Sequence, residues 1–552
     1  MLKYFLSYAL FLGLSASAQI LNCDTNWTLP MAPPVELSAG FGDLRPNHFH
    51  MGIDIRTAGK ENLPIYAIAD GYVSRLKVSS VGYGWVLYVD HPNGYTSVYA
   101  HCNRFAERIQ KLYLDTSAVR FQNELDILLA PNQLPVQKGA QIAFSGNTGG
   151  SSGPHLHFEL RDTKTEHALN PLLHGFKVSD SGQPVLSGIR LYAVDPNGFE
   201  VPTKSLVLAV SQKNLKTQLP QGFLREGDRI GMAIHVDDYF TKAGRTLGLF
   251  SAEVWTAKEG HFAFELDEID FEDARYINAH HDYTYAQLSK KKFQKLFKTP
   301  NNPLTIYPYE GNGSFELSAM DSTHFAIMLR DVNGNESQYE LWVAYPHPKM
   351  PTKTAYSAQS HWLPEGSYLY NTGLWQVQID SFTFFEPVRK NMDLAAKRIA
   401  SSQVQLARPV HLSYALKDSL AGAQYVLTMN GSPLSTRFEA GKLCAEAKTL
   451  GTFGLRKDET APTLQPQANN KLDSLNNGAW TWILKDDFSG VAAYSCWQNG
   501  KWTAAYYDAK NQLLRTQFEV PFLPGTLIEV RVRDAAGIER VVQSSTPLAP
   551  FK

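Results

Sequence analysis

The hydrophobic residues between positions 37 and 176 fall into short runs that Gly-rich turns separate, a pattern that favours β-strands over helices. Two turns, Asp70-Gly71 and His91-Pro92-Asn93-Gly94, have the composition of tight hairpin connections. Each is therefore expected to join the strand before it to the strand after it. The strands expected in this region cover residues 64–69, 72–78, 85–90, 95–101, 141–145 and 155–161.

Helical periodicity is confined to one stretch of this region. From Ala106 to Asp126, the apolar residues Ile109, Leu112 and Tyr113 are spaced to line one face of a helix. Residues 106–133 are therefore interpreted as an insertion in an otherwise compact β domain. A Gly-rich loop over residues 146–153 precedes the last expected strand.

Beyond Val178 the expected strands are short, and turn residues recur at intervals typical of β-sandwiches. Residues 236–240 (VDDYF) resemble 485–488 (KDDF), and residues 330–334 (RDVNG) resemble 533–537 (RDAAG). Because both pairs run in the same order, two related sandwich domains are expected. The first of them carries an insertion around residues 267–307.

The predicted fold class is mainly β, with a β-rich N-terminal domain followed by several β-sandwich domains. The predicted segments are a signal peptide (1–18), the N-terminal domain (19–176), an immunoglobulin-like sandwich with an insertion (177–347), a further sandwich (348–457) and a second immunoglobulin-like sandwich (458–552).

The composition supports this division. The chain has 552 residues, which exceeds what one hydrophobic core organises, and a hydrophobic fraction of 43% is enough for several cores. A formal net charge of -1 provides no broad electrostatic attraction for nucleic acid or anionic lipid, so no nucleic-acid partner is expected.

The N-terminus has the pattern of a secretory signal. Lys3 is followed by an apolar stretch over residues 4–14 and by Ala16-Ser17-Ala18, so cleavage before Gln19 is expected, with an uncleaved anchor as the alternative. No later segment is apolar enough to span a bilayer, so no transmembrane anchor is expected after cleavage. An exported protein of the periplasm or cell envelope is predicted.

The four cysteines, Cys23, Cys102, Cys444 and Cys496, lack CxxC spacing, so they do not predict a thiolate metal site. After export they could form bridges or remain reduced. Leu21-Asn22 before Cys23 does not resemble a lipoprotein cleavage site, so lipidation is not expected.

The candidate chemistry lies in two short motifs, His50-Met51-Gly52-Ile53-Asp54 and His155-Leu156-His157. A catalytic zinc ion takes three nitrogen or oxygen ligands and keeps a fourth position for water. On a strand, His155 and His157 point to the same side. His50 and Asp54 need a bend between them to converge, and Gly52 is suited to provide it.

Several motifs together resemble the lysostaphin/LytM-type metallopeptidases. They occur in order over about 130 residues: Phe41-Gly42, His50-Met51-Gly52-Ile53-Asp54, Ala69-Asp70-Gly71, Tyr99-Ala100-His101, Gly146-Asn147-Thr148-Gly149 and Pro154-His155-Leu156-His157-Phe158. The resemblance implies a LytM-type β-rich domain, a partly open barrel or sandwich, with a cleft that holds one Zn²⁺ ion.

The resemblance also implies roles for individual residues. His50, Asp54 and His157 correspond to the zinc ligands, and His101 and His155 to two catalytic histidines whose individual roles stay open. His48 is a competing ligand that the HxxxD spacing disfavours. Tyr83, in Gly82-Tyr83-Gly84, and Asn147 are candidate substrate-binding residues, with a purely structural turn as the alternative for Tyr83.

The predicted function is hydrolysis of peptide cross-links in bacterial peptidoglycan by a zinc-dependent endopeptidase. The sandwich domains are expected to position the enzyme or to bind an envelope protein partner. One alternative is a non-catalytic LytM-like regulator of other wall hydrolases, and another is an envelope adhesin or structural protein. A further hypothesis is that the insertion at 106–133 covers the metal and keeps the enzyme closed.

Two acidic or amide-rich turns in the first sandwich are candidate calcium sites. Asp237-Asp238 and Asn333-Gly334-Asn335 carry oxygen ligands, but solvated turns are the favoured interpretation for both.

Overall fold

The computed structural model describes residues 21–24, 26–178, 180, 182–237, 247–257, 260–317, 320–351, 359–400, 403–416, 424–467, 480–516 and 526–545. The expected signal peptide and Asp238 lie outside these ranges. Within them, no helix has both the length and the apolar character needed to cross a membrane. The described cysteine side chains, Cys102, Cys444 and Cys496, are free thiols.

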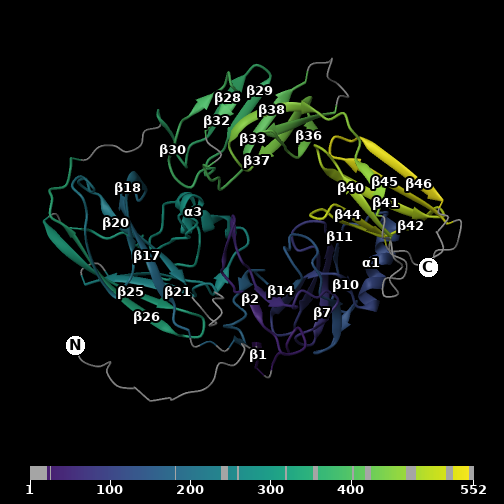
Figure 1. Ribbon diagram of the computed structural model, residues 1–552, viewed down its shortest axis with the longest axis horizontal. Coiled ribbons are helices and arrows are strands. Elements are labelled where there is room, and N and C mark those ends of the chain that lie inside the picture. Colours follow the sequence, from purple (N-terminus) through teal and green to yellow (C-terminus); the bar gives the residue numbers. More distant parts are fainter. Residues whose placement is uncertain are drawn as a thin grey trace.

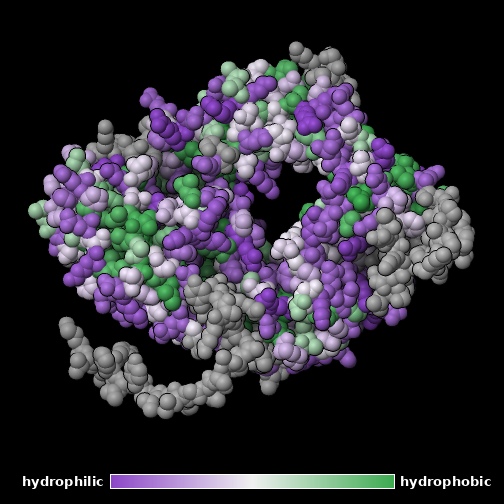
Figure 2. Space-filling model, viewed as in Figure 1, coloured by the Kyte–Doolittle hydropathy of each residue, from purple (hydrophilic) through white to green (hydrophobic). Residues whose placement is uncertain are grey.

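The chain is mainly β, as predicted, and its sheets form four groups arranged as a ring (Figure 1). We call them the N-terminal unit (21–178), the second unit (180–351), the third unit (359–457) and the last unit (458–545). The domain boundaries at 176, 347 and 457 stay predictions. An opening passes through the middle of the ring, and hydrophilic and neutral surface borders most of it (Figure 2).

One large sheet dominates the N-terminal unit. Its strands run in the order β11-β7-β8-β9-β14-β15-β23, with β5 on β14, β2 on β5 and β12 on β7, so the sheet stays open. The strands of this unit are β1 (Leu21–Cys23), β2 (Leu37–Ala39), β3 (Leu44–Arg45), β4 (His48–Phe49), β5 (Ile53–Arg56), β6 (Pro64–Tyr66), β7 (Gly71–Val78), β8 (Trp85–Asp90), β9 (Tyr95–Cys102), β10 (Arg104–Phe105), β11 (Leu125–Leu128), β12 (Pro135–Val136), β13 (Gln141–Phe144), β14 (His155–Asp162), β15 (Ala168–Leu169) and β16 (Phe176–Val178).

The expected strands are all present, but one expected hairpin is wrong. The His91–Gly94 turn joins β8 to β9, as predicted. By contrast, β6 pairs with β13 rather than with β7. The chain bends at residues 68–70, where the Ile68 amide donates to Tyr99 Oη at 3.0 Å instead of to a neighbouring strand.

The insertion forms helix α1 (Glu107–Arg120) followed by β11. Ile109 and Tyr113 are buried on the predicted face of α1, and Tyr113 packs on Trp85. Both β11 and β12 pair with β7, which β8 and β9 separate from β14. The insertion therefore extends the edge of the sheet far from β14 and does not lie across it.

The second and last units are two-sheet sandwiches with corresponding strand orders. In the second unit the sheets run β18-β17-β20-β24 and β19-β26-β25-β21-β22, and in the last unit they run β39-β40-β44-β43 and β42-β41-β45-β46. If β17 is matched with β39, then β20 matches β40, and β26-β25-β21-β22 matches β46-β45-β41-β42. This correspondence agrees with the sequence echoes.

The bounds of these elements are as follows. The second unit holds β17 (Val185–Val194), β18 (Glu200–Ala209), β19 (Asn214–Gln218), β20 (Arg229–Asp237), β21 (Ser251–Thr256), β22 (Gly260–Glu265), β23 (Glu268–Ile269), η1 (Ala274–Tyr276), α2 (Ile277–His280), α3 (Tyr283–Ser289), β24 (Gln294–Lys295), β25 (Asp321–Arg330) and β26 (Glu336–Tyr345). The last unit holds β39 (Thr463–Pro466), β40 (Trp480–Lys485), β41 (Val491–Gln498), β42 (Lys501–Thr503), β43 (Ala505–Asp508), β44 (Leu513–Thr516), β45 (Leu527–Asp534) and β46 (Glu539–Ser545).

The third unit lies between them and contains two five-stranded sheets, β28-β29-β33-β37-β36 and β31-β32-β38-β34-β35, and the pair β27-β30. Its strands are β27 (His361–Trp362), β28 (Tyr368–Thr372), β29 (Trp375–Ile379), β30 (Val388–Arg389), β31 (Met392–Asp393), β32 (Arg398–Ile399), β33 (Val410–Ala415), β34 (Tyr425–Met429), β35 (Ser432–Pro433), β36 (Thr436–Glu439), β37 (Lys442–Ala447) and β38 (Gly451–Lys457).

The last unit closes the ring by packing on the N-terminal unit beside α1 (Figure 1). Asn123, which is only 4% exposed, donates to the Tyr494 carbonyl at 2.9 Å and accepts from the Ala505 amide at 2.8 Å. Trp502 packs edge-on against Phe121 and donates to Ser117 Oγ at 3.2 Å. The contact is therefore a packed interface whose buried polar groups are hydrogen-bonded.

Replacing Asn123 with Ala should weaken this closure. The change leaves the Tyr494 carbonyl and the Ala505 amide without their partner in a buried position, which costs about 1–3 kcal/mol. Hydrogen exchange at β43 should then accelerate by roughly 5- to 150-fold, as measured by mass spectrometry of peptic peptides. Gln122→Ala, at the exposed neighbouring position, is the matched control. Equal exchange rates in both variants would contradict the proposed contribution of Asn123 to the stability of this interface.

Candidate metal centre

The pairing of β5 with β14 brings the two predicted motifs together. In this antiparallel ladder Asp54 lies directly opposite His157, and His155 lies opposite Arg56. Directly opposed residues have their Cβ atoms about 4.5–5.5 Å apart, so the two side chains share one face of the sheet. His155 occupies the same face because it lies two residues before His157.

His50 reaches this face through a bend before β5. Gly52 lies in the bend, and a Cβ atom there would collide with the Phe158 carbonyl on β14. The residues on either side of His50 fix its direction, since Phe49 and Met51 are buried in the hydrophobic core that the second unit shares. Gly52 thus allows the close approach that the sequence pattern required.

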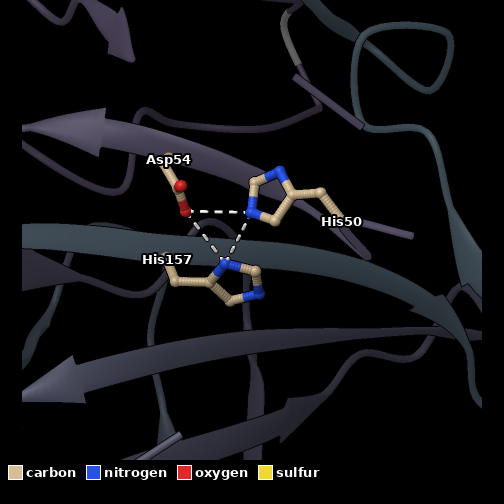
Figure 3. Close-up of side chains that lie close together, drawn as sticks. All are labelled: His50, Asp54 and His157. Atoms are coloured by element: carbon tan, nitrogen blue, oxygen red, sulfur yellow. Dashed lines mark hydrogen bonds and ion pairs between the residues drawn. The ribbon is translucent and has the colours of Figure 1, made fainter. Parts of the chain in front are cut away.

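Three donor atoms converge at one point (Figure 3). His50 Nε2, His157 Nδ1 and Asp54 Oδ1 lie 3.0 Å from one another. His50 Nδ1 donates to the Gly40 carbonyl at 2.6 Å, and His157 Nε2 donates to Glu159 Oε1 at 2.8 Å. In the neutral rings, the two converging nitrogens therefore carry lone pairs rather than protons.

This donor set suits a metal ion. Two imidazole lone pairs and a carboxylate oxygen repel one another unless a cation lies between them, and they are common ligands of zinc. Burial alone raises the pKa of Asp54, but the neighbouring His155, His157 and His50 outweigh burial and hold that pKa far below its usual range. The carboxylate is therefore ionised, as metal binding requires.

The surroundings of His157 are electrostatically negative. Burial lowers the pKa of His157, but Asp54 and Glu159 on either side raise it to about 9. The site thus attracts positive charge, and a metal ion competes with a proton for it. Arg45 Nη2 binds the second oxygen of Asp54 at 3.2 Å, which leaves Oδ1 free to face the histidines.

His101 and His155 stand beside this cluster. His101 Nδ1 donates to the Thr148 carbonyl at 2.8 Å, and His155 Nδ1 donates to the Gly153 carbonyl at 2.8 Å. The two rings lie 4.8 Å apart, and His155 Nε2 is 3.3 Å from Asp54 Oδ1. Burial lowers the pKa of His101 to about 3, assisted by the neighbouring His157 and His155, so the ring is neutral.

The strand β14 contributes two further residues that the sequence analysis did not single out. Glu159 is fully buried and binds His157, Arg161 and the Tyr83 hydroxyl. It therefore fixes the ring orientation of His157, as carboxylates behind metal-binding histidines do. The alternation of His155, His157, Glu159 and Arg161 along one strand was a signal that could have revealed this group.

The candidate substrate-binding residues have structural partners. Tyr83 packs on the His157 ring at 5.4 Å in addition to binding Glu159. Asn147 accepts at its side-chain oxygen from Lys510 of the last unit at 3.0 Å. Their role in substrate binding stays a prediction. The competing ligand His48 is exposed, binds the Pro46 carbonyl and is absent from the cluster.

Other units hold the two segments that border the cluster. On one side, Asn278 binds Asn47, and Lys292 binds the Leu44 carbonyl, so the second unit fixes the β3–β4 hairpin. On the other side, Tyr506 accepts from the Gly149 amide at 3.0 Å. Lys510 donates to the Ser151 carbonyl at 2.8 Å. The last unit therefore fixes the loop whose carbonyls orient His101 and His155.

Comparison with known proteins gives a family match in the same region. Residues 48–112 and 120–171 match the model of Peptidase family M23. The gap between the two segments falls at the end of α1. The match thus covers the five histidine and aspartate positions discussed above.

Three relatives illustrate the similarity. An uncharacterized metalloprotease of Haemophilus influenzae is 31% identical over 26% of this chain and 23% of its own. The DD-carboxypeptidase/endopeptidase Mpg of Neisseria meningitidis is 33% identical over 20% of each chain. The murein hydrolase activator NlpD of Escherichia coli is 37% identical over 22% of this chain and 24% of its own.

The chain thus spans about a fifth to a quarter of the length of the curated relatives it matches. The family match lies within the N-terminal unit, which carries the converging His50, Asp54 and His157. That unit contains a domain of peptidase family M23, the family to which the lysostaphin/LytM-type resemblance pointed.

Proposed function

We propose that the protein is a zinc-dependent endopeptidase that hydrolyses peptide cross-links of bacterial peptidoglycan. The observation that carries the proposal is the convergence of His50 Nε2, His157 Nδ1 and Asp54 Oδ1 beside two further histidines, His101 and His155. The names of two relatives, a DD-carboxypeptidase/endopeptidase and a murein hydrolase activator, support peptidoglycan as the substrate. An exported protein of the periplasm or cell envelope fits that substrate.

In this proposal His50, Asp54 and His157 hold one Zn²⁺ ion. When bound, zinc lowers the pKa of a water molecule and polarises the scissile carbonyl. The chain itself supplies two imidazole nitrogens, Nε2 of His101 and Nε2 of His155, whose opposite nitrogens are committed to backbone carbonyls. Each can accept a proton from water or, once protonated, donate a hydrogen bond to a developing oxyanion.

The side chains around these histidines keep them in place during the reaction. Ser151 Oγ lies 3.1 Å from His155 Nδ1, and Thr148, which orients His101, is itself bound to the Cys102 carbonyl at 2.8 Å. Such fixed geometry removes the reorganisation that a mobile general base would need. Tyr83 and Asn147 border the same face and remain the proposed substrate contacts.

Because one of the relatives is the murein hydrolase activator NlpD, a second candidate function is regulation of another wall hydrolase. A regulator stimulates a separate wall hydrolase without cleaving a bond itself. Digestion of defined muropeptides by the purified chain, followed by mass spectrometry, distinguishes the two functions. Cleaved peptide products support the peptidase, whereas intact muropeptides together with stimulation of an added murein hydrolase would support the regulator.

Replacing His155 or His101 with Ala should lower muropeptide cleavage by about 10²- to 10⁴-fold, because each removes a proton-transfer group. Zinc content, measured by elemental analysis, should stay at one ion in both variants because neither residue is a ligand. His48→Ala is the matched control, since His48 is exposed and outside the cluster. Wild-type rates in His155→Ala would rule out the assigned role.

Replacing Glu159 with Gln should lower the affinity for zinc by about 10- to 100-fold, because His157 loses the carboxylate that orients its ring and raises its basicity. Competition with a chromophoric chelator measures the affinity, and thermal melting of the apo chain reports any separate loss of stability. Glu166→Gln, at an exposed position in the turn that follows β14, is the control. Unchanged zinc affinity in Glu159→Gln would contradict the positioning role.

A further inference from the structure

A second cluster of acidic residues lies in the last unit, far along the chain from the metal centre. Asp458 precedes β39, Asp486 follows β40, and Asp534 ends β45. One carboxylate oxygen from each lies within 4.8 Å of the others. Asp458 is 2% exposed and Asp534 is 1% exposed, so two of these carboxylates are removed from water.

The oxygens of this cluster are only partly satisfied. Asp486 Oδ2 accepts from the amides of Phe488 and Gly490, and Asp534 Oδ1 accepts from the Ile538 amide. Asp486 Oδ1 and Asp534 Oδ2 are buried without any hydrogen-bond donor. Among the described residues, no Lys, Arg or His forms an ion pair with any of the three aspartates. An ionised, buried oxygen without a donor or a cation is costly.

The second unit shows how the same framework is satisfied without a cation. Asp331 corresponds to Asp534, since Oδ1 of each accepts at 2.8 Å from the amide four residues later. In the second unit that later residue is Asn335, whose side-chain amide donates to Asp331 Oδ2 at 2.7 Å and to the Asp180 carbonyl at 3.3 Å. In the last unit the position is Ile538, whose side chain has no hydrogen-bond donor.

The remaining aspartates correspond as well. Asp180 and Asp458 each lie four residues before a proline, Pro184 or Pro462, and each accepts from the amide two residues later. Asp237 is the last residue of β20, and Asp486 directly follows the matching strand β40. The last unit therefore has the three corresponding carboxylates. It lacks a side-chain amide like that of Asn335, which donates to the second carboxylate oxygen in the second unit.

We propose that Asp458, Asp486 and Asp534 bind one calcium ion. The ligand set consists of oxygen alone, which favours a hard cation over zinc. Calcium–oxygen distances of about 2.3–2.6 Å place ligands up to about 5 Å apart across the ion, which matches the spacing of these oxygens. Magnesium requires a smaller and more regular octahedral coordination shell. Ligands from two loops (Asp486 and Asp534) and from the segment between two units (Asp458) suit the more variable shell of calcium better.

The position of the site gives it a mechanical consequence. The Asp458 amide donates to the Gln424 carbonyl of the third unit at 2.8 Å, and Arg456 of that unit stacks on Phe488 at 3.8 Å. An ion that joins Asp458 to Asp486 and Asp534 therefore fastens the segment between the third and last units to the loops of the last unit. Calcium would stiffen this joint of the ring.

The test uses the full mature chain loaded with zinc, so that the first cluster is filled, in thermal melting and isothermal titration with CaCl₂. Calcium should bind with a stoichiometry of one and raise the melting temperature by about 5 °C or more at saturation. Asp534→Asn and Ile538→Asn should both abolish the shift. Ile538→Asn should also raise the calcium-free melting temperature, because it supplies the amide that Asn335 supplies in the second unit.

Asp487→Asn, which alters the neighbouring acidic residue outside the cluster, is the control and should keep the calcium response. Three results would overturn the proposal. They are the absence of calcium binding to the wild type, an equal shift with MgCl₂ at the same concentration, and a full calcium response in both Asp534→Asn and Ile538→Asn. Because no readout depends on peptide hydrolysis, the outcome is independent of the proposed peptidase activity.

Discussion

The antiparallel register of β5 on β14 is the constraint on which the metal centre depends. It sets Asp54 opposite His157 and places His155 on the same face. A slip of one residue would turn the whole set of β5 side chains to the other face of the sheet. Two packing facts hold the register. Ile53 and Ile55 alternate with Asp54 and are fully buried, and Gly52 lets the chain approach Phe158 without a Cβ atom. The geometry of the candidate metal centre thus follows from the hydrophobic alternation of β5.

The remaining parts of the centre depend on units outside the sheet. Phe49 and Met51 anchor His50 in a core that belongs largely to the second unit, while Tyr506 and Lys510 of the last unit bind the loop behind His101 and His155. One side of the candidate centre is therefore held by the second unit and the other side by the last unit. The ring is what holds the two sides at a fixed separation, so its closure at Asn123 and Trp502 belongs to the architecture of the site.

Much of the N-terminal unit could be predicted because its information is local. Residues 85–101 contain both strands and their turn, and the motifs around His50 and His157 carry their own spacing. The prediction that β6 pairs with β7 was wrong. The actual partner, β13, is distant in the sequence, and so is Tyr99, which binds the Ile68 amide at the bend after β6. The role of the insertion also escaped prediction. Ser117 and Asn123 form hydrogen bonds with Trp502 and Ala505, which are distant in the sequence, and no periodicity of the chain predicts that contact.

The two sandwiches show how one residue can change the hydrogen bonding of a similar framework. Both have three aspartates at corresponding positions, and a single position, Asn335 in one and Ile538 in the other, decides whether side chains of the protein satisfy the carboxylate oxygens. In the last unit, Asp458 precedes β39 and Asp486 follows β40, at one edge of a four-stranded sheet, and Tyr506 lies on β43 at the opposite edge of that sheet. With strands about 4.8 Å apart, this sheet spans roughly 14 Å. An ion bound by the aspartates would therefore hold one edge of the sheet whose other edge supports the loop of His101 and His155.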